Sequence, residues 1–303
     1  MFALRRLCLV LVFFVCRIPA GAQLVINELM QSNVDCIMDD LNEFPDSWVE
    51  LCNAGTGEVN LGDYRLGITQ NADEAWPLPG RTLQSGEHVL VFCDKVGSNT
   101  DAGIHTDFRL ESGKGGAVFL FRGDDVADGL TELKKQPAPN IAYGRKTDCA
   151  DEWGYMAEPT PGAPNCGKVY AKAMTEPVFS VEGGVWHEGE EVKLKISAPH
   201  AAPAGTVVRF TRDGTEPTAS STRLPAGRAL FIKKNTVVRA KLFCEGYLPS
   251  RSTVHSYIFF PNDRPLTLPV ISLVTDPRYL YDDKIGIYVE GNYSGEQFNY
   301  QYD

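Results

Sequence analysis

Short runs in which β-branched and aromatic residues alternate with polar ones recur along the chain, and long helical periodicity is absent. Gly, Pro, Asn and Asp bound these runs, a pattern typical of antiparallel strands joined by tight turns. The first part of the chain is predicted to form strands at 24–29, 48–52, 64–68, 88–92, 117–121 and 140–143. The second part is predicted to form them at 192–196, 207–211, 229–232, 237–243 and 253–259. The expected fold class is therefore all-β, with immunoglobulin-like β-sandwiches in tandem.

Two further apolar runs lie near the end of the sequence. Residues 268–274 read as a buried strand, and residues 286–289 as a second one. A segment of this size cannot bury a core of its own, so we interpret it as the incomplete start of a further domain.

The first 22 residues have the order of a secretory signal peptide. Arg5 and Arg6 precede the apolar run 7–15, and the small residues Ala20 and Ala22 mark a cleavage site after Ala22. The run is too short for a lasting membrane helix, and no later stretch has about 18 consecutive apolar residues. The sequence predicts a secreted, cell-surface or periplasmic protein without a transmembrane segment after cleavage.

Two other interpretations of this leader are less favourable. A buried N-terminal strand or helix would not require charge, apolar run and small residues in this order. Lipid attachment at Cys16 would need a small residue just before the cysteine, where Phe14 and Val15 stand.

The turn-forming and proline-rich segments between the apolar runs divide the chain into five parts. Residues 158–165 contain three prolines and are expected to be stiff, as a linker would be. The predicted parts are a signal peptide at 1–22, a sandwich at 23–166, a linker at 167–176, a smaller sandwich at 177–260 and an incomplete domain at 261–303.

Composition and charge narrow the possible partners. Hydrophobic residues make up 43% of the chain and charged residues 22%, which is ordinary for a globular protein. The formal net charge is −10, and no compensating basic stripe is evident in the sequence. Such a chain repels phosphate backbones, so no nucleic-acid partner is expected.

Six cysteines follow the leader, at positions 36, 52, 93, 149, 166 and 244. Export permits disulfides, and the sequence leaves the pairing open. Cys149 and Cys166 flank a Pro/Gly-rich loop and are the candidate pair. Cys52 and Cys93 lie in apolar strands and are expected as buried thiols, whereas Cys244 is expected to be unpaired.

The first part of the chain resembles the lamin tail domain (LTD) family as found in exported bacterial proteins. Seven segments carry the resemblance in order, at 24–30 (LVINELM), 46–53 (DSWVELCN), 61–66 (LGDYRL), 76–79, 83–92, 105–110 and 159–165 (PTPGAPN). The chain departs from the family pattern by one extra residue, Ser47, and by Cys52 where an aromatic residue is usual. The resemblance implies an immunoglobulin-like sandwich that binds or localises rather than catalyses.

The second part, residues 177–257, resembles the small β-sandwich appended to chitobiases and hexosaminidases, the chitobiase C-terminal domain. Residues 210–218 (FTRDGTEPT) match its signature turn, and residues 240–250 match its closing strand. This resemblance implies an accessory module without chemistry of its own.

Residues 268–291 are similar to the opening of the spore-coat-protein-H (CotH) kinase-like family. The catalytic carboxylates and phosphate-binding residues of that family would lie past Asp303, so none is assigned to this chain.

One acidic loop is a weak calcium candidate. Its hard oxygen ligands come at close spacing, from Asp35, Asp39, Asp40, Glu43 and Asp46. The EF-hand order fails because Leu41 stands where the tight turn needs Gly, and a solvated acidic loop is the more economical interpretation. No other metal site and no cofactor is expected.

Catalytic and sugar-binding signals are few. The five histidines are scattered without an evident partner carboxylate, and no nucleophile elbow occurs, so no catalytic residue is expected. Trp153 and Trp186 fall at loops or loop edges, where exposed rings can stack on sugar faces.

These observations favour an exported, non-catalytic β-sandwich protein. We expect it to bind an unidentified protein or glycan at the cell envelope or outside the cell. One alternative is the targeting arm of a CotH-like secreted kinase whose catalytic part lies beyond residue 303. The other is a carbohydrate-binding accessory protein in glycan breakdown.

Overall fold

The computed structural model describes residues 24–111, 116–165, 167–263 and 267–289, so the leader lies outside the described residues. Strands account for 39% of the chain and helices for 4%, which confirms the all-β class. The chain divides into two compact units, and each is described by itself. The first unit contains the described residues up to Gln31, Pro45–Lys135 and Thr160–Pro164. The second contains Ser32–Phe44, Gln136–Pro159 and the described residues from Asn165 onward.

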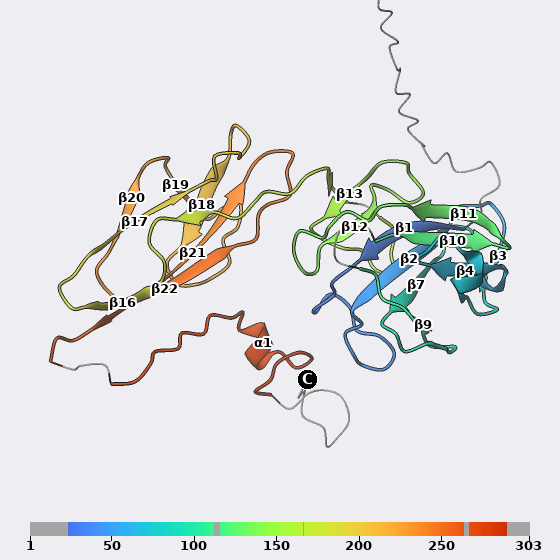
Figure 1. The fold of residues 1–303 in the computed structure, drawn as a ribbon, viewed down its shortest axis with the longest axis horizontal. Coiled ribbons are helices and arrows are strands. Elements are labelled where there is room, and N and C mark those ends of the chain that lie inside the picture. The colour runs from blue at the N-terminus through green and yellow to red at the C-terminus, as the bar shows by residue number, and fades with distance from the viewer. Residues whose placement is uncertain (1–23, 112–115, 166, 264–266, 290–303) are drawn as a thin grey trace, which may run out of the picture. The chain divides into compact units, whose positions relative to one another are not determined.

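The first unit is built from two main sheets (Figure 1). One has the order β1-β2-β7-β9-β8, with bounds Leu24–Met30, Ser47–Asn53, His88–Cys93, Ile104–Thr106 and Ser98–Asn99. The other has the order β11-β10-β4-β5, with bounds Asp125–Leu130, Val118–Arg122, Tyr64–Gly67 and Trp76–Pro77. A short pair, β3 and β6, and two single 3₁₀ turns, η1 and η2, complete it, at Val59–Asn60, Thr82–Leu83, Leu61–Asp63 and Ala72–Glu74.

The strands β1 and β2 form the buried centre of this unit. Every residue of both strands is buried, so these strands have cover on both faces. The two sheets are joined by a hydrogen bond that the backbone N–H of Ile26 in β1 donates to the carboxylate of Asp128 in β11, at 2.8 Å. A buried carboxylate that accepts a backbone hydrogen bond fixes the sheets in one relative position.

The proline-rich segment Thr160–Pro164 is held against the first unit by two buried carboxylates. Glu28 and Glu50 lie opposite each other on β1 and β2, and both are 0% exposed. Glu28 accepts hydrogen bonds from the N–H of Thr160 at 3.1 Å and from its hydroxyl at 2.7 Å. Glu50 accepts from the N–H of Gly162 at 2.7 Å. The prediction of a linker at 158–165 is wrong for this segment, because its backbone amides pair with carboxylates that the sequence pattern places in strands.

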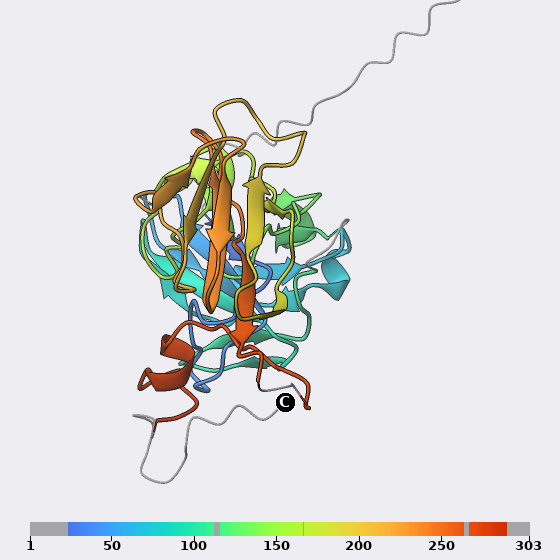
Figure 2. The same ribbon diagram turned by 90° about the vertical axis from the view of Figure 1, so that its left-hand side faces the viewer.

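The second unit contains a sandwich with one core between two sheets (Figures 1 and 2). The smaller sheet has the order β15-β17-β20, at Val178–Phe179, Val192–Ser197 and Ala229–Ile232. The larger has the order β16-β22-β21-β18-β19, at Gly184–His187, Thr253–Phe260, Thr236–Phe243, Val207–Thr211 and Thr222–Leu224. Three more antiparallel strands of this unit, β12, β13 and β14, span Ala142–Arg145, Trp153–Met156 and Val169–Tyr170.

Strict alternation builds the core of this sandwich. In β17 the apolar residues Val192, Leu194 and Ile196 are buried while the lysines between them are exposed. They pack with buried residues of the larger sheet, among them Leu242 and Tyr257, both 0% exposed. The two-residue period of a strand therefore carries the apolar side chains into one layer between the sheets.

The last described segment differs from its prediction. Residues 268–274 form no strand, and Leu268, Ile271 and Leu273 are 78%, 84% and 89% exposed, so the expected buried strand is wrong. Residues 286–289 lie in turns, after the four-residue helix α1 (Arg278–Tyr281). A strand needs backbone hydrogen bonds to a neighbouring strand, and none of the described strands pairs with 268–274.

Circular dichroism provides a direct check of the fold class. The spectrum of residues 23–303 is expected to show sheet with little helix, because the described helices are single turns. A helical content above about one third, the average for globular proteins, would contradict this architecture.

Candidate functional site

A buried acid–base pair lies in the first unit. The Nδ1 atom of His105 in β9 is 2.6 Å from a carboxylate oxygen of Asp94, and the two side chains are 1% and 8% exposed. The ring of Phe92 lies 5.2 Å from the imidazole ring, centroid to centroid. Because both side chains are buried, the pair is part of the packed interior of this unit.

Sequence reasoning missed this pair and assigned the histidines no partner carboxylate. The two residues come together because β9 runs parallel to β7, with His105 beside Phe92. A parallel pairing of two short strands leaves no turn signature that would place Asp94 next to His105.

The acidic residues of the calcium candidate lie in two places. Asp46 belongs to the first unit, where its carboxylate is 2.6 Å from the Nε atom of Arg109. Asp35, Asp39, Asp40 and Glu43 belong to the second unit. In the described part of that unit, no three of these four carboxylates gather within the range that a shared cation requires.

Two of these carboxylates already interact with other groups of the protein. One oxygen of Asp39 accepts hydrogen bonds from the N–H groups of Leu41 and Glu43, both at 2.9 Å, so it closes a turn. Asp35 accepts a hydrogen bond from the side-chain amide of Asn140 and lies 3.4 Å from the guanidinium of Arg278. The loop is thus ordered by its own backbone and by neighbouring side chains.

The two tryptophans proposed for sugar stacking make protein contacts. Trp153 stacks on Tyr143 with 5.4 Å between ring centroids and 24° between planes. The guanidinium of Arg145 also lies over Trp153, 4.8 Å from the ring centroid. Trp186 lies at the edge of the second core, 5.4 Å from Tyr257 and 5.9 Å from Phe259 between centroids. Both rings are half-buried, which reduces the surface that a sugar could cover.

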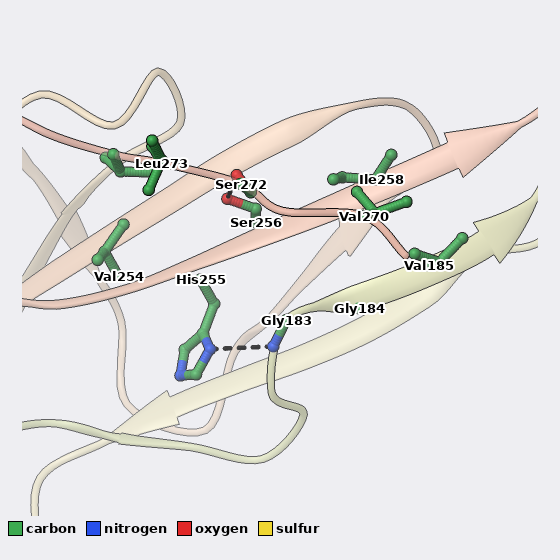
Figure 3. A pocket seen from close by; sticks show the side chains of 11 residues that line it. Gly183, Gly184, Val185, Val254, His255, Ser256, Ile258, Val270, Ser272 and Leu273 are labelled. Carbon is green, nitrogen blue, oxygen red and sulfur yellow. Dashed lines mark hydrogen bonds between the residues drawn. The ribbon is translucent and has the colours of Figure 1, made fainter. Parts of the chain in front are cut away.

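A groove of about 530 Å³ lies in the second unit, bounded by β16, β22 and residues 270–274 (Figure 3). Its walls are about as polar as they are apolar, and the apolar lining residues include Val185, Val254, Ile258, Val270 and Leu273. The hydroxyls of two further lining residues, Ser256 and Ser272, are hydrogen-bonded to each other at 2.7 Å. The described part of the lining therefore brings no pair of acidic and basic groups together.

Among the described residues that line this groove, His255 is the titratable one. Its Nδ1 atom accepts a hydrogen bond from the N–H of Gly183 at 2.9 Å (Figure 3). Its ring lies 4.9 Å from the ring of Phe179, centroid to centroid. Burial lowers the pKa of His255 below its ordinary value of 6.5, and the charge of Glu182 opposes this effect. The neutral imidazole is favoured because a protonated Nδ1 could not accept that bond.

The lowered pKa of His255 predicts a pH-dependent stability. The folded pKa lies below the unfolded one, so the contribution is fully present above pH 6.5 and is lost as the pH falls through the folded pKa. Melting temperatures measured between about pH 5 and pH 8 should show this loss. His255→Gln should flatten the profile in that window, and an unchanged profile would contradict the assignment.

The predictions for three cysteines are confirmed, and the prediction of one disulfide is not tested. Cys52 and Cys93 are 1% and 0% exposed, which confirms their expected burial. Burial raises the pKa of the Cys93 thiol to about 12, so it is not a nucleophile at neutral pH. Cys244 is a half-buried free thiol, as expected. Cys166 lies outside the described residues, so its pairing with Cys149 stays a prediction.

No family model matches the chain, and no curated protein matches its sequence. Within the described residues, no helix combines the length and the apolar character that a membrane crossing demands.

Proposed function

We propose that the chain is an exported, non-catalytic binding or localisation protein that acts at the cell envelope or outside the cell. This proposal rests on one observation: the candidate acid–base groups make contacts within the fold. Asp94 and His105 are paired inside the first unit, and His255 accepts a backbone hydrogen bond. These acid–base groups take part in contacts within rigid sheets. Recognition of a partner would therefore use the exposed faces and loops.

Export and binding can be tested separately. Expression of the chain in a bacterial host, followed by N-terminal sequencing of the exported product, should give a chain that starts at Gln23. Purified residues 23–303, labelled and mixed with isolated cell envelopes, should bind saturably and compete with the unlabelled protein. Intact leader in the cytosol would overturn export, and non-saturable adsorption would overturn specific binding.

A second candidate function is favoured by the exposure of the last described segment. Apolar residues such as Ile271 and Leu273 lie more than four-fifths exposed, which is unusual for an apolar run of this length. This supports the alternative of a targeting arm for a CotH-like secreted kinase whose catalytic part lies beyond residue 303. The gene sequence downstream of the last codon distinguishes the candidates, because a continuation without acidic metal-binding motifs would remove this alternative.

A further inference from the structure

Charge is unevenly distributed along the chain. The whole sequence carries −10, yet residues 177–260 contain eleven Lys and Arg against seven Asp and Glu. The second sandwich is therefore a positive module within an acidic chain. Sequence inspection showed no basic stripe because the cations of this module are separated along the chain and meet only through strand pairing.

Three cations form a row across the larger sheet of this sandwich. Arg209 in β18 lies opposite Arg223 of β19 on one side and opposite Lys241 of β21 on the other. Directly opposite residues have Cβ atoms about 5 Å apart. The neighbours of these residues point into the core, since Val208, Phe210, Leu224, Ala240 and Leu242 are all buried. The three side chains, named here the cation row, consequently lie on the outer face of the sheet.

A carboxylate neutralises the positive charge only at the Lys241 end of the cation row. The carboxylate of Glu216 is 3.0 Å from the Nζ atom of Lys241 and 2.5 Å from Arg239 on the same strand. Arg209 donates a hydrogen bond to the carbonyl of Ser221 at 2.6 Å. Among the described residues, no carboxylate is within ion-pair distance of Arg209 or Arg223. Like charges placed directly opposite each other destabilise a sheet, so the fold alone does not explain this arrangement.

An aromatic pocket lies next to the cation row. Val207 and Phe243 are opposite each other two residues along the strands from Arg209 and Lys241, on the same face. They line a pocket of about 300 Å³ together with Tyr170 and Tyr247, and its rim carries one cation, Lys168, and one carboxylate, Glu245. Aromatic rings beside cations suit a ligand that has both a ring with an apolar face and a negative charge.

We propose that the outer face of this sheet binds an acidic polysaccharide. Its carboxylates would contact the cation row, and a sugar ring would enter the pocket at Phe243 and Tyr247. This inference rests on the proposed function as an exported binding protein and names its ligand class. A nucleic acid fits less well, because its dense phosphates would need more cations than this face offers on a chain of net charge −10.

The test compares two charge-matched variants of the 23–303 protein. Arg209→Gln with Arg223→Gln removes two members of the cation row. Lys193→Gln with Lys195→Gln removes two exposed cations from β17, on the other sheet of the same sandwich. Affinity electrophoresis and calorimetry would use polygalacturonate as the acidic probe, dextran as the neutral one and oligo(dT) as the nucleic acid.

The parent protein should bind polygalacturonate in a salt-dependent manner and bind dextran weakly or not at all. The arginine variant should lose about tenfold in affinity or more, whereas the lysine variant should keep the parent affinity. The melting temperature of the arginine variant should stay close to that of the parent, because the loss of a like-charge contact offsets the loss of the hydrogen bond from Arg209 to the carbonyl of Ser221. A lower melting temperature would indicate a structural role for the arginines.

Other outcomes overturn the inference. No binding to polygalacturonate, equal losses in both variants, or equal affinity for oligo(dT) would each do so. Saturable envelope binding that survives in the arginine variant would leave the proposed function intact while removing this site. If the parent protein showed no saturable binding to envelopes, the proposed function itself would be contradicted.

Discussion

Replacing Glu28 with alanine is expected to lower the free energy of unfolding by about 3 kcal/mol, because two partly buried donors lose a charged acceptor. The donors are the N–H and the hydroxyl of Thr160, both bonded to the Glu28 carboxylate. Urea unfolding followed by tryptophan fluorescence measures the change. The substitution should also make the segment Thr160–Pro164 more accessible to proteases, since one of its two carboxylate attachments is gone.

Two variants serve as controls for this expectation. Glu28→Gln keeps an acceptor oxygen and removes the repulsion from Glu50, which lies directly opposite, so it should lose less stability than alanine. Glu58→Ala, at an exposed position of the same unit, should change stability by no more than about 0.5 kcal/mol. If Glu28→Ala were as stable as the parent, the carboxylates would not hold this segment.

Tyr257→Ala is expected to cost about 4 kcal/mol, as large-to-small substitutions of buried aromatic residues do. The side chain is 0% exposed, belongs to the core of the second sandwich and packs against Trp186. Its hydroxyl donates a hydrogen bond to the carbonyl of Val181 at 2.7 Å. The measurement is again urea unfolding, with the fluorescence of Trp186 expected to shift as its neighbouring ring is removed.

Tyr257→Phe separates packing from hydrogen bonding at this position. The ring contacts remain and only the bond to Val181 is lost, so the expected cost is about 1 kcal/mol. Equal losses for the phenylalanine and alanine variants would show that the hydroxyl, and not the packed ring, stabilises this core.

The pattern of alternating apolar residues predicted most strands correctly. Residues 192–196 and 253–259 lie within the observed β17 and β22, and residues 48–52 lie within β2. These predictions succeed because a strand that buries one face, or is bounded by turn residues, carries its signal locally. The strand expected at 140–143 begins later, at Ala142, where the backbone first pairs with β13.

The local sequence pattern gave wrong predictions where the structure of a segment depends on residues far away in the sequence. Residues 268–274 have strand composition, but no described strand pairs with them. The proline-rich segment at 160–164 looks like a linker, but carboxylates more than a hundred positions earlier in the chain bind its amides. In both cases the deciding contact is absent from the local sequence.

The sequence by itself determined that the chain is all-β and where most of its strands lie, because alternation and turn residues act within a few positions. The tertiary structure alone decided which side chains meet: Asp94 with His105, Glu28 with Thr160, and Arg209 with Arg223 and Lys241. The physical reason is that strand order, register and loop docking are set by packing across the whole unit, and a one-residue change of register would move the side chains of a strand to its opposite face.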